Sequence, residues 1–152
     1  GGKHANTWFG KSKLSLSERY INNLMRTGKY TGKKQSATKA FKSALDEINQ
    51  KTDQNPLQIF VDAIINSAQR EEITRIRFGA VSQPKAVDSS PSRRLDTAIR
   101  NLAKGATQGT SKSKRSLKDC IVNELIKASN GDATSFAISK KEEIERIAAS
   151  AR

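Results

Sequence analysis

The sequence predicts a mostly α-helical fold, with about six helices and a protruding two-stranded β-hairpin between the third and fourth helices. Three observations lead to this prediction. Apolar residues recur at three- and four-residue spacing over most of the chain, which is typical of helices with one buried face. From residue 73 the period changes to two, which is typical of a strand. Asn55-Pro56 and Ser90-Pro91 each join a capping residue to a proline that fits the first helical position.

Two helices are expected before residue 55. Positions 15–18 have the spacing of a capping box, and Gly28 stands where a helix usually ends. The apolar side of this first helix contains Leu16, Tyr20, Ile21, Leu24 and Met25. The second helix, at about 33–50, has a core stripe of Ala37, Ala40, Phe41, Ala44, Leu45 and Ile48. Residues 1–14 lack periodicity, so we expect a basic tail that is disordered when free.

The third helix begins at Asn55-Pro56 and precedes the hairpin. Its predicted buried face consists of Leu57, Phe60, Val61, Ile64, Ile65 and Ala68. After an acidic break at Glu71-Glu72, we expect hairpin strands at about 73–88 that reverse at Gly79-Ala80. A buried helix thus supports a projecting arm whose exposed groups are largely arginine.

Three more helices follow the arm within a single domain at 15–152. The fourth begins at Ser90-Pro91, and its core residues are Leu95, Ala98, Ile99, Leu102 and Ala106. Residues 106–113 are expected to form a flexible connection. The fifth helix covers about 117–128 and stops at Asn130-Gly131. A second capping box at 139–142 is expected to open the last helix.

The charge points to an acidic partner. The chain has 152 residues, with 28 Lys and Arg against 15 Asp and Glu, for a net charge of +13. Nucleic acid is the commonest partner of such a surface, and a basic surface that only aids solubility is the alternative. A membrane surface is disfavoured, because no stretch approaches eighteen apolar residues and no basic amphipathic helix carries bulky apolar groups. The chain begins Gly-Gly without Met, so we expect a natural N-terminus that is processed or longer.

Lysine and arginine pairs stand in or just before four predicted first turns, where the helix dipole disfavours cations. These pairs are Lys33-Lys34, Arg93-Arg94, Lys114-Arg115 and Lys140-Lys141. Chance placement in a Lys- and Arg-rich chain is one explanation. The other is that each helix start receives a phosphate, because free backbone N–H groups and flanking cations both favour an anion. This pattern favours recognition of a nucleic-acid backbone by its shape.

Catalysis is disfavoured by the residues present. Residues 28–34 approach the phosphate-binding P-loop, but the glycine spacing is one residue short and Lys34 occupies the Ser/Thr place. His4 has no Cys or His neighbours, and Cys120 is more typical of a small core residue than of a nucleophile. A single cysteine permits no internal disulfide and fits a reducing compartment. We therefore expect no catalytic residue, metal or cofactor.

A stand-alone helical DNA-binding factor remains the alternative among binding proteins. It would need a recognition helix with Asn, Gln or Arg aimed at base edges, and usually a dimer surface. Two hypotheses are possible for Trp8: its side chain could stack on a nucleobase, or it could be buried in the protein's own core.

The chain resembles the universal small-subunit ribosomal protein S-seven family, in its archaeal and eukaryotic cytosolic form. The similar blocks, which include the Gly32-Lys33-Lys34 turn, are 17–34, 55–58, 62–67, 70–76, 86–88, 90–94 and 137–146. The resemblance implies a cytoplasmic, non-enzymatic component of the small ribosomal subunit that binds the 3′ major (head) domain of its rRNA and helps nucleate head assembly. It also implies an arm near exit-site tRNA and emerging mRNA, close to the S-eleven protein.

Charge, helix starts and the resemblance together give the candidate site residues. Those expected to bind rRNA, beginning in the tail, are Lys3, Trp8, Lys11, Lys13, Lys29, Lys33, Lys34, Arg75, Arg77, Arg93, Arg94, Lys112, Lys114, Arg115, Lys140 and Lys141. Those expected at the mRNA and tRNA exit path are Arg77, Phe78, Gly79, Gln83 and Lys85.

Overall fold

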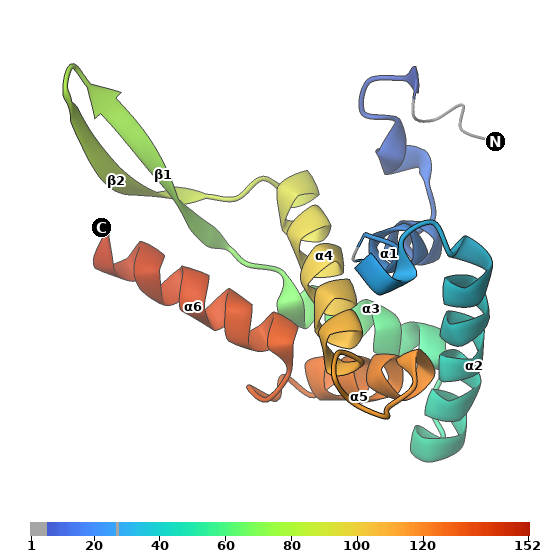
Figure 1. Cartoon of the computed structure of the whole chain (residues 1–152). Helices are drawn as coiled ribbons and strands as arrows, with labels where there is room; N and C mark the ends of the chain where they lie inside the picture. The colour runs from blue at the N-terminus through green and yellow to red at the C-terminus, as the bar shows by residue number, and fades with distance from the viewer. Residues whose placement is uncertain (1–5, 27) are drawn as a thin grey trace.

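A computed structural model describes residues 6–26 and 28–152, and within this part it contains six α-helices and one antiparallel hairpin (Figure 1). The helices are α1 (Leu16–Leu24), α2 (Lys34–Thr52), α3 (Pro56–Ser67), α4 (Pro91–Gly109), α5 (Leu117–Ser129) and α6 (Phe136–Ser150). The strands are β1 (Glu71–Phe78) and β2 (Val81–Asp88), and the short 3-10 helices are η2 (Gly10–Lys13) and η3 (Gly28–Tyr30). The predicted fold class is confirmed, including the place of the hairpin between α3 and α4.

The core is built around α5, which packs against α2, α3 and α4. Large aliphatic side chains from these helices are almost wholly removed from solvent, and they include Ile48, Ile99, Leu102, Ile121 and Leu125. Such side chains contribute about 1.5–3 kcal/mol each when fully buried. The helical body is therefore held together by apolar burial, which leaves its cations free to lie on the surface.

Three aromatic rings join α1, α2 and α3. The ring centroids of Tyr20, Phe41 and Phe60 lie 5.3–5.4 Å apart, in tilted or edge-on arrangements that suit their quadrupoles. Tyr20 is fully buried, and its hydroxyl has no hydrogen-bond partner among the described residues. Burial, with a smaller contribution from the charge of Glu124, raises the pKa of Tyr20 well above its ordinary value.

The hairpin projects beyond the helices as an arm, and α6 runs beside its base (Figure 1). Phe78 pairs with Val81 across the predicted turn, where Gly79 has a φ of 63°, a conformation that favours glycine. The predicted acidic break is wrong, because β1 already begins at Glu71. The two glutamates belong to the ladder and hold the arm in place: Glu71 pairs with Arg152 beyond α6, and Glu72 pairs with Arg93 on α4.

The predicted buried face of α3 is rotated from the observed one. Leu57 and Ile65 are 52% and 61% exposed, whereas the buried residues are Ile59, Phe60, Ala63, Ile64 and Ser67. The helix is apolar over more than half of its circumference, so periodicity alone did not decide which side faces the core. The main contacts of α3 are with α5, and the buried face of α3 includes the small side chains of Ala63 and Ser67.

Three predicted helix ends also differ from the structure. The first helix ends at Leu24 rather than at Gly28. The fourth continues into the first part of the predicted flexible connection and ends at Gly109, which lies so close to Cys120 that an added Cβ would be 3.1 Å from its Sγ. The last helix begins at Phe136, one turn before the predicted capping box.

The early start of α6 has a tertiary cause. The carboxylate of Glu124 on α5 accepts hydrogen bonds from the Ser135 hydroxyl at 2.8 Å and from the backbone N–H of Ala137 at 3.1 Å. A buried carboxylate from another helix therefore satisfies the free N–H groups that a local cap would otherwise satisfy. Lys140 and Lys141 consequently lie in the second turn of α6, not in its first.

Candidate nucleic-acid interface

The outward face of α4 carries three basic residues and a threonine in one row. Ser90 caps the helix by accepting a hydrogen bond from the backbone N–H of Arg93 at 3.4 Å. The opposite face is buried through Ala98, Ile99, Leu102 and Ala106. Side chains spaced by three and four residues on the remaining side therefore face outward together. We call this set the α4 stripe, and it consists of Arg93, Thr97, Arg100 and Lys104.

A hollow of about 200 Å³ lies between α1 and α4, on one side of the α4 stripe. Asp96 accepts hydrogen bonds there from Lys11, at 2.5 Å, and from Arg19. Arg26 and Arg100 line the same hollow, and neither forms an ion pair with any described residue. One carboxylate thus faces four cations, which leaves the hollow positively charged and suited to an anion.

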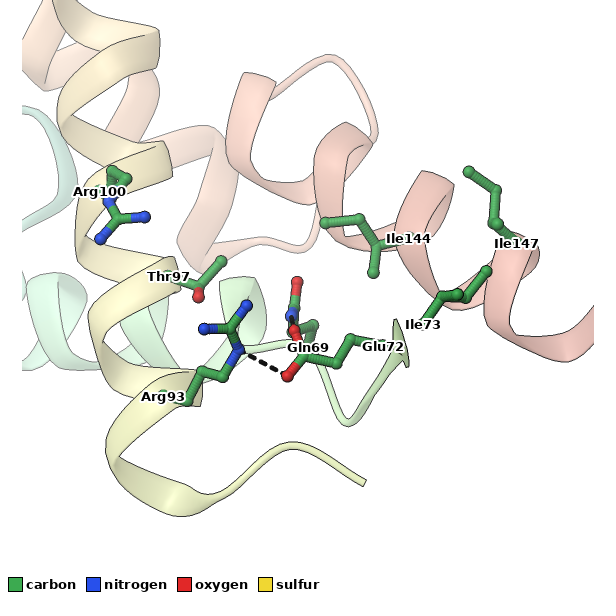
Figure 2. A pocket seen from close by; sticks show the side chains of 8 residues that line it. All are labelled: Gln69, Glu72, Ile73, Arg93, Thr97, Arg100, Ile144 and Ile147. Atoms are coloured by element: carbon green, nitrogen blue, oxygen red, sulfur yellow. Dashed lines mark hydrogen bonds and ion pairs between the residues drawn. The ribbon is translucent and has the colours of Figure 1, made fainter. Parts of the chain in front are cut away.

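A second hollow, of about 320 Å³, lies on the other side of the α4 stripe, between the base of the arm and α6 (Figure 2). Its lining residues are Gln69, Glu72, Ile73, Arg93, Thr97, Arg100, Ile144 and Ile147. Glu72 holds Arg93 by an ion pair at 2.5 Å. Arg100 lines both hollows, so this residue of the α4 stripe lies between them.

The helix-start pairs are less free than the sequence suggested. Lys34 pairs with Glu18, and Arg93 pairs with Glu72. Arg94 is half-buried and donates a hydrogen bond from Nε to the backbone carbonyl oxygen of Gln69 at 3.1 Å. At the start of α2 and of α4, intramolecular partners therefore take up part of the positive charge that was attributed to RNA binding alone.

The other two pairs also differ from the prediction. Lys140 pairs with Glu143 at 2.7 Å within α6, away from that helix's first turn. Lys114 and Arg115 precede α5, whose first turn has Asp119 and a side-chain cap from Ser116. The idea that four helix starts carry uncompensated cations is therefore wrong for α6, and at the starts of α2 and α4 it holds only in part, because Lys34 and Arg93 have intramolecular ion pairs.

The described part of the tail presents two adjacent aromatic side chains to solvent. Trp8 is 90% exposed and Phe9 is 82% exposed, so the reading in which Trp8 enters the core is wrong. Phe9 has a φ of 56°, and the next residue, Gly10, is buried. The ion pair of Lys11 with Asp96 ties η2 to α4, while Lys13 is exposed. Of the sequence candidates, Lys3 lies outside the described residues.

The arm presents different groups on its two faces. Arg75 and Arg77 are exposed on one face, because alternate residues of a strand point the same way. The other face carries Phe78 and, from the partner strand, Gln83 and Lys85, which pair with Ile76 and Thr74. At the tip, Phe78 and Val81 are 72% and 60% exposed. The arm thus combines a cationic face with an apolar tip.

Two separate basic segments meet beside the C-terminal end of α4. The η3 turn, with Lys29, and the connection after α4 line a common hollow of about 250 Å³ that includes Tyr30, Thr107 and Ser111. The ammonium group of Lys29 lies 5.6 Å from the centre of the Tyr30 ring. The same connection carries the exposed residues Lys112, Lys114 and Arg115, and the η3 turn leads into Lys33.

The sequence prediction missed four cations that lie on α1 and α4 or just after α1. Arg19 lies on α1, Arg26 lies two residues after α1, and Arg100 and Lys104 lie on α4. For Arg19, Arg100 and Lys104 the signal is helical spacing within the body of a helix, whereas the analysis of the sequence concentrated on helix starts.

Among the described residues, no group of three or more His, Cys, Asp or Glu side chains could hold a metal ion. No helix in the described ranges has the length and apolarity needed to cross a membrane. Cys120 is buried, and burial raises the pKa of its thiol, which lowers its reactivity as a nucleophile.

Comparison with known proteins gives one consistent match. The family described as ribosomal protein S7p/S5e matches residues 3–152. A protein of Thermoplasma volcanium is 55% identical over 152 residues, which is all of this chain and 83% of the relative. A protein of Picrophilus torridus is 53% identical over 152 residues, covering 81% of the relative, and one of Archaeoglobus fulgidus is 51% identical over 151 residues, covering 78%.

All three relatives are named small ribosomal subunit protein uS7. The matched regions cover 99–100% of the chain, so the helical body, the arm and the α4 stripe all lie within them. This chain therefore belongs to the ribosomal protein S7p/S5e family, in its archaeal form.

Proposed function

We propose that this chain binds the 3′ major (head) domain of small-subunit rRNA and helps to nucleate assembly of the subunit head. Its family is structural and non-enzymatic, and its relatives are small-subunit proteins. The chain is accordingly a structural component of the small ribosomal subunit, where it contacts rRNA and ribosomal proteins.

The observation that carries the RNA-binding proposal is the α4 stripe between its two hollows. Arg100 projects from a rigid, packed helix and has no intramolecular ion pair among the described residues. A fixed cation beside concave surfaces favours the phosphates of a folded RNA, whose spacing depends on its shape. The helical body then binds phosphates from separate RNA segments and holds those segments in a defined arrangement.

The remaining candidate residues extend this interface on three sides. We propose that the tail, 1–14, binds RNA with Trp8 and Phe9 available for stacking and Lys3, Lys11 and Lys13 for phosphate contact. The basic cluster formed by Lys29, Lys33, Lys34, Lys112, Lys114 and Arg115 would serve a second RNA segment. Lys140 and Lys141 on α6 would serve a third.

The arm is proposed to shape the tRNA and mRNA exit path. Its exposed cations, Arg75, Arg77 and Lys85, suit nucleic-acid backbones that move past the subunit head. The apolar tip formed by Phe78 and Val81 suits a neighbouring protein, for which we propose the S-eleven protein. Gly79 permits the tight turn that brings these two side chains together at the tip.

Competition binding with paired variants tests the RNA-binding proposal. Full-length protein is titrated with a head-domain rRNA fragment and with duplex DNA of equal length. Replacing Arg100 and Lys104 by alanine should weaken RNA binding about tenfold or more and lower the salt slope by about one to two. Lys39→Ala with Lys42→Ala is the control, because it also removes two exposed cations, but from α2.

Two results would contradict the proposal. One is an equal loss of affinity in the α4 and α2 double variants, which would indicate attraction by net charge alone. The other is equal affinity for duplex DNA, which would favour the DNA-binding alternative.

A further inference from the structure

The hollow between α4, α6 and the base of the arm contains an unsatisfied buried acceptor. Gln69 is only 2% exposed, and its Nε2 donates a hydrogen bond to Oε2 of Glu72 at 3.2 Å. This contact fixes the orientation of the amide, because the carboxylate requires a donor. Gln69 Oε1 then has no partner among the described residues, and Figure 2 shows the side chain at the centre of the hollow.

The polar groups around this acceptor are of two kinds. Glu72 and Gln69 together form an acceptor-rich edge near the arm. Arg100 stands on the opposite side and is available for an anion, whereas Arg93 is held by Glu72. A ligand that satisfies the hollow must therefore present N–H donors at one end and a negative charge at the other.

The third wall of the hollow is apolar. Ile73 comes from β1, and Ile144 and Ile147 come from α6 (Figure 2). Ile147 is 46% exposed, so this wall is open to solvent on one side. A flat apolar group placed against these three side chains would cover them.

We propose that this hollow binds one unstacked nucleotide of RNA whose base carries an exocyclic amino group. The base lies against the isoleucine wall, its amino group donates to Gln69 Oε1, and its phosphate lies near Arg100. Guanine fits best, because its ring N–H stands beside its amino group and gives a second donor toward Glu72. Uracil fits worst, since its only N–H lies between two carbonyl oxygens that would face the carboxylate.

This inference rests on the proposed RNA-binding function and adds a base-selective site to it. A cavity of this size falls within the range of small-molecule sites, and unstacked bases are the part of RNA that proteins read directly. The carboxyl terminus of another protein, with an aliphatic last residue, is the rival occupant. It would place a carboxylate near Arg100 without requiring any choice between bases.

Methyl NMR of the full chain tests the site. Guanosine monophosphate, uridine monophosphate, inorganic phosphate and the tripeptide Gly-Gly-Leu are each titrated while the isoleucine methyl signals are followed. Guanosine monophosphate should shift Ile73, Ile144 and Ile147 but not the core residue Ile99. It should bind about fivefold or more tightly than uridine monophosphate, because the latter leaves acceptors unpaired.

Gln69→Leu removes the acceptor at similar volume and should abolish the preference for guanosine over uridine monophosphate. The control is Gln50→Leu at the exposed end of α2, and this variant should keep the preference for guanosine monophosphate. If Gln69→Leu does not fold, Arg100→Gln serves instead and should weaken both nucleotides about equally.

Three outcomes overturn the site: equal binding of both nucleotides, shifts caused equally by phosphate alone, or binding of the tripeptide without binding of guanosine monophosphate. Wild-type protein that binds head-domain RNA yet shows one of these outcomes would refute the nucleotide site alone. Protein that binds neither RNA nor nucleotide would also refute the proposed function.

Discussion

At the scale of single residues, the buried side chains of Tyr20 and Gln69 each have a polar atom without a hydrogen-bond partner among the described residues, and they lie in different surroundings. Tyr20 places a hydroxyl among aromatic rings without a hydrogen-bond partner, and Gln69 leaves an acceptor facing a hollow. Each unpaired buried group costs on the order of 1–3 kcal/mol. The Tyr20 hydroxyl lies inside the core, whereas Gln69 lines a hollow beside α4.

Replacing Tyr20 by phenylalanine should leave stability at pH 7 unchanged or raise it by up to about 1 kcal/mol, because the lost hydroxyl is unpaired. The folded-state pKa of Tyr20 is raised, so the native state holds this proton more tightly than the unfolded state. Its contribution is fully present below the unfolded pKa and is lost as pH rises above about 10. Urea unfolding at pH 7 and pH 11 should show less alkaline loss in the variant than in the wild type. An identical alkaline loss would mean that other groups cause it.

Arg93 and Arg94 also differ in the intramolecular contacts that their side chains make. From sequence alone, the two arginines were expected to serve RNA alike. The structure gives Arg94 a bond to the carbonyl of Gln69, whereas Arg93 makes an exposed ion pair.

Arg94→Ala should therefore destabilise the fold by roughly 1–2 kcal/mol, because the carbonyl of a buried residue loses its donor. Arg93→Ala should cost less than about 1 kcal/mol, as is usual for an exposed ion pair. Thermal unfolding of the two single variants checks this. Equal melting temperatures for both would return the pair to the purely RNA-binding role expected from the sequence.

At the scale of helices and strands, short sequence motifs predicted the features that depend on neighbouring residues alone, namely local helix caps and the hairpin turn. Ser15, Asn55 and Ser90 cap the helices where the sequence placed them, and the Gly79-Ala80 turn sets the register of the arm. The buried face of α3 was not predictable, because that helix is apolar on too many sides. The start of α6 was not predictable either, since its cap comes from Glu124 on another helix.

The same division applies to the candidate interface. Lys11, Arg93 and the cations of the arm were predicted from charge and spacing and stay predictions. Arg100 was missed because its importance depends on two hollows formed by α1, α6 and the arm, segments far apart in sequence.

The cap of α6 yields a prediction at this scale. Glu124→Gln keeps the shape of the side chain but removes the charge at the N-terminal end of the helix, and it should cost about 1–2 kcal/mol. Gly105→Ala should also destabilise, because an added Cβ would lie 2.9 Å from the Glu124 carboxyl group. Urea unfolding measures both, with exposed Glu142→Gln as the control. A Glu142 variant that loses as much stability as the Glu124 variant would argue against a specific cap.

At the scale of the whole molecule, the helical body and the projecting arm are proposed to have different roles. The ion pairs of Glu71 and Glu72 fix the base of the arm to α6 and α4. Beyond that base the arm makes no apolar core, and its tip is exposed. RNA affinity should therefore depend on the body, and exit-site function on the distal arm.

An arm shortened in register tests this division. Removing residues 75–78 and 81–84 while keeping Gly79-Ala80 brings Thr74 opposite Lys85, a pair of the same type as Phe78 and Val81. The base of the arm and its two ion pairs are retained. Thermal unfolding and affinity for head-domain RNA should change little, because the α4 stripe and the core are intact. Small subunits assembled with the variant should bind exit-site tRNA more weakly, measured by filter binding of deacylated tRNA. If the shortened protein instead fails to enter subunits, the distal arm serves assembly, and the body alone does not explain how the chain engages the head.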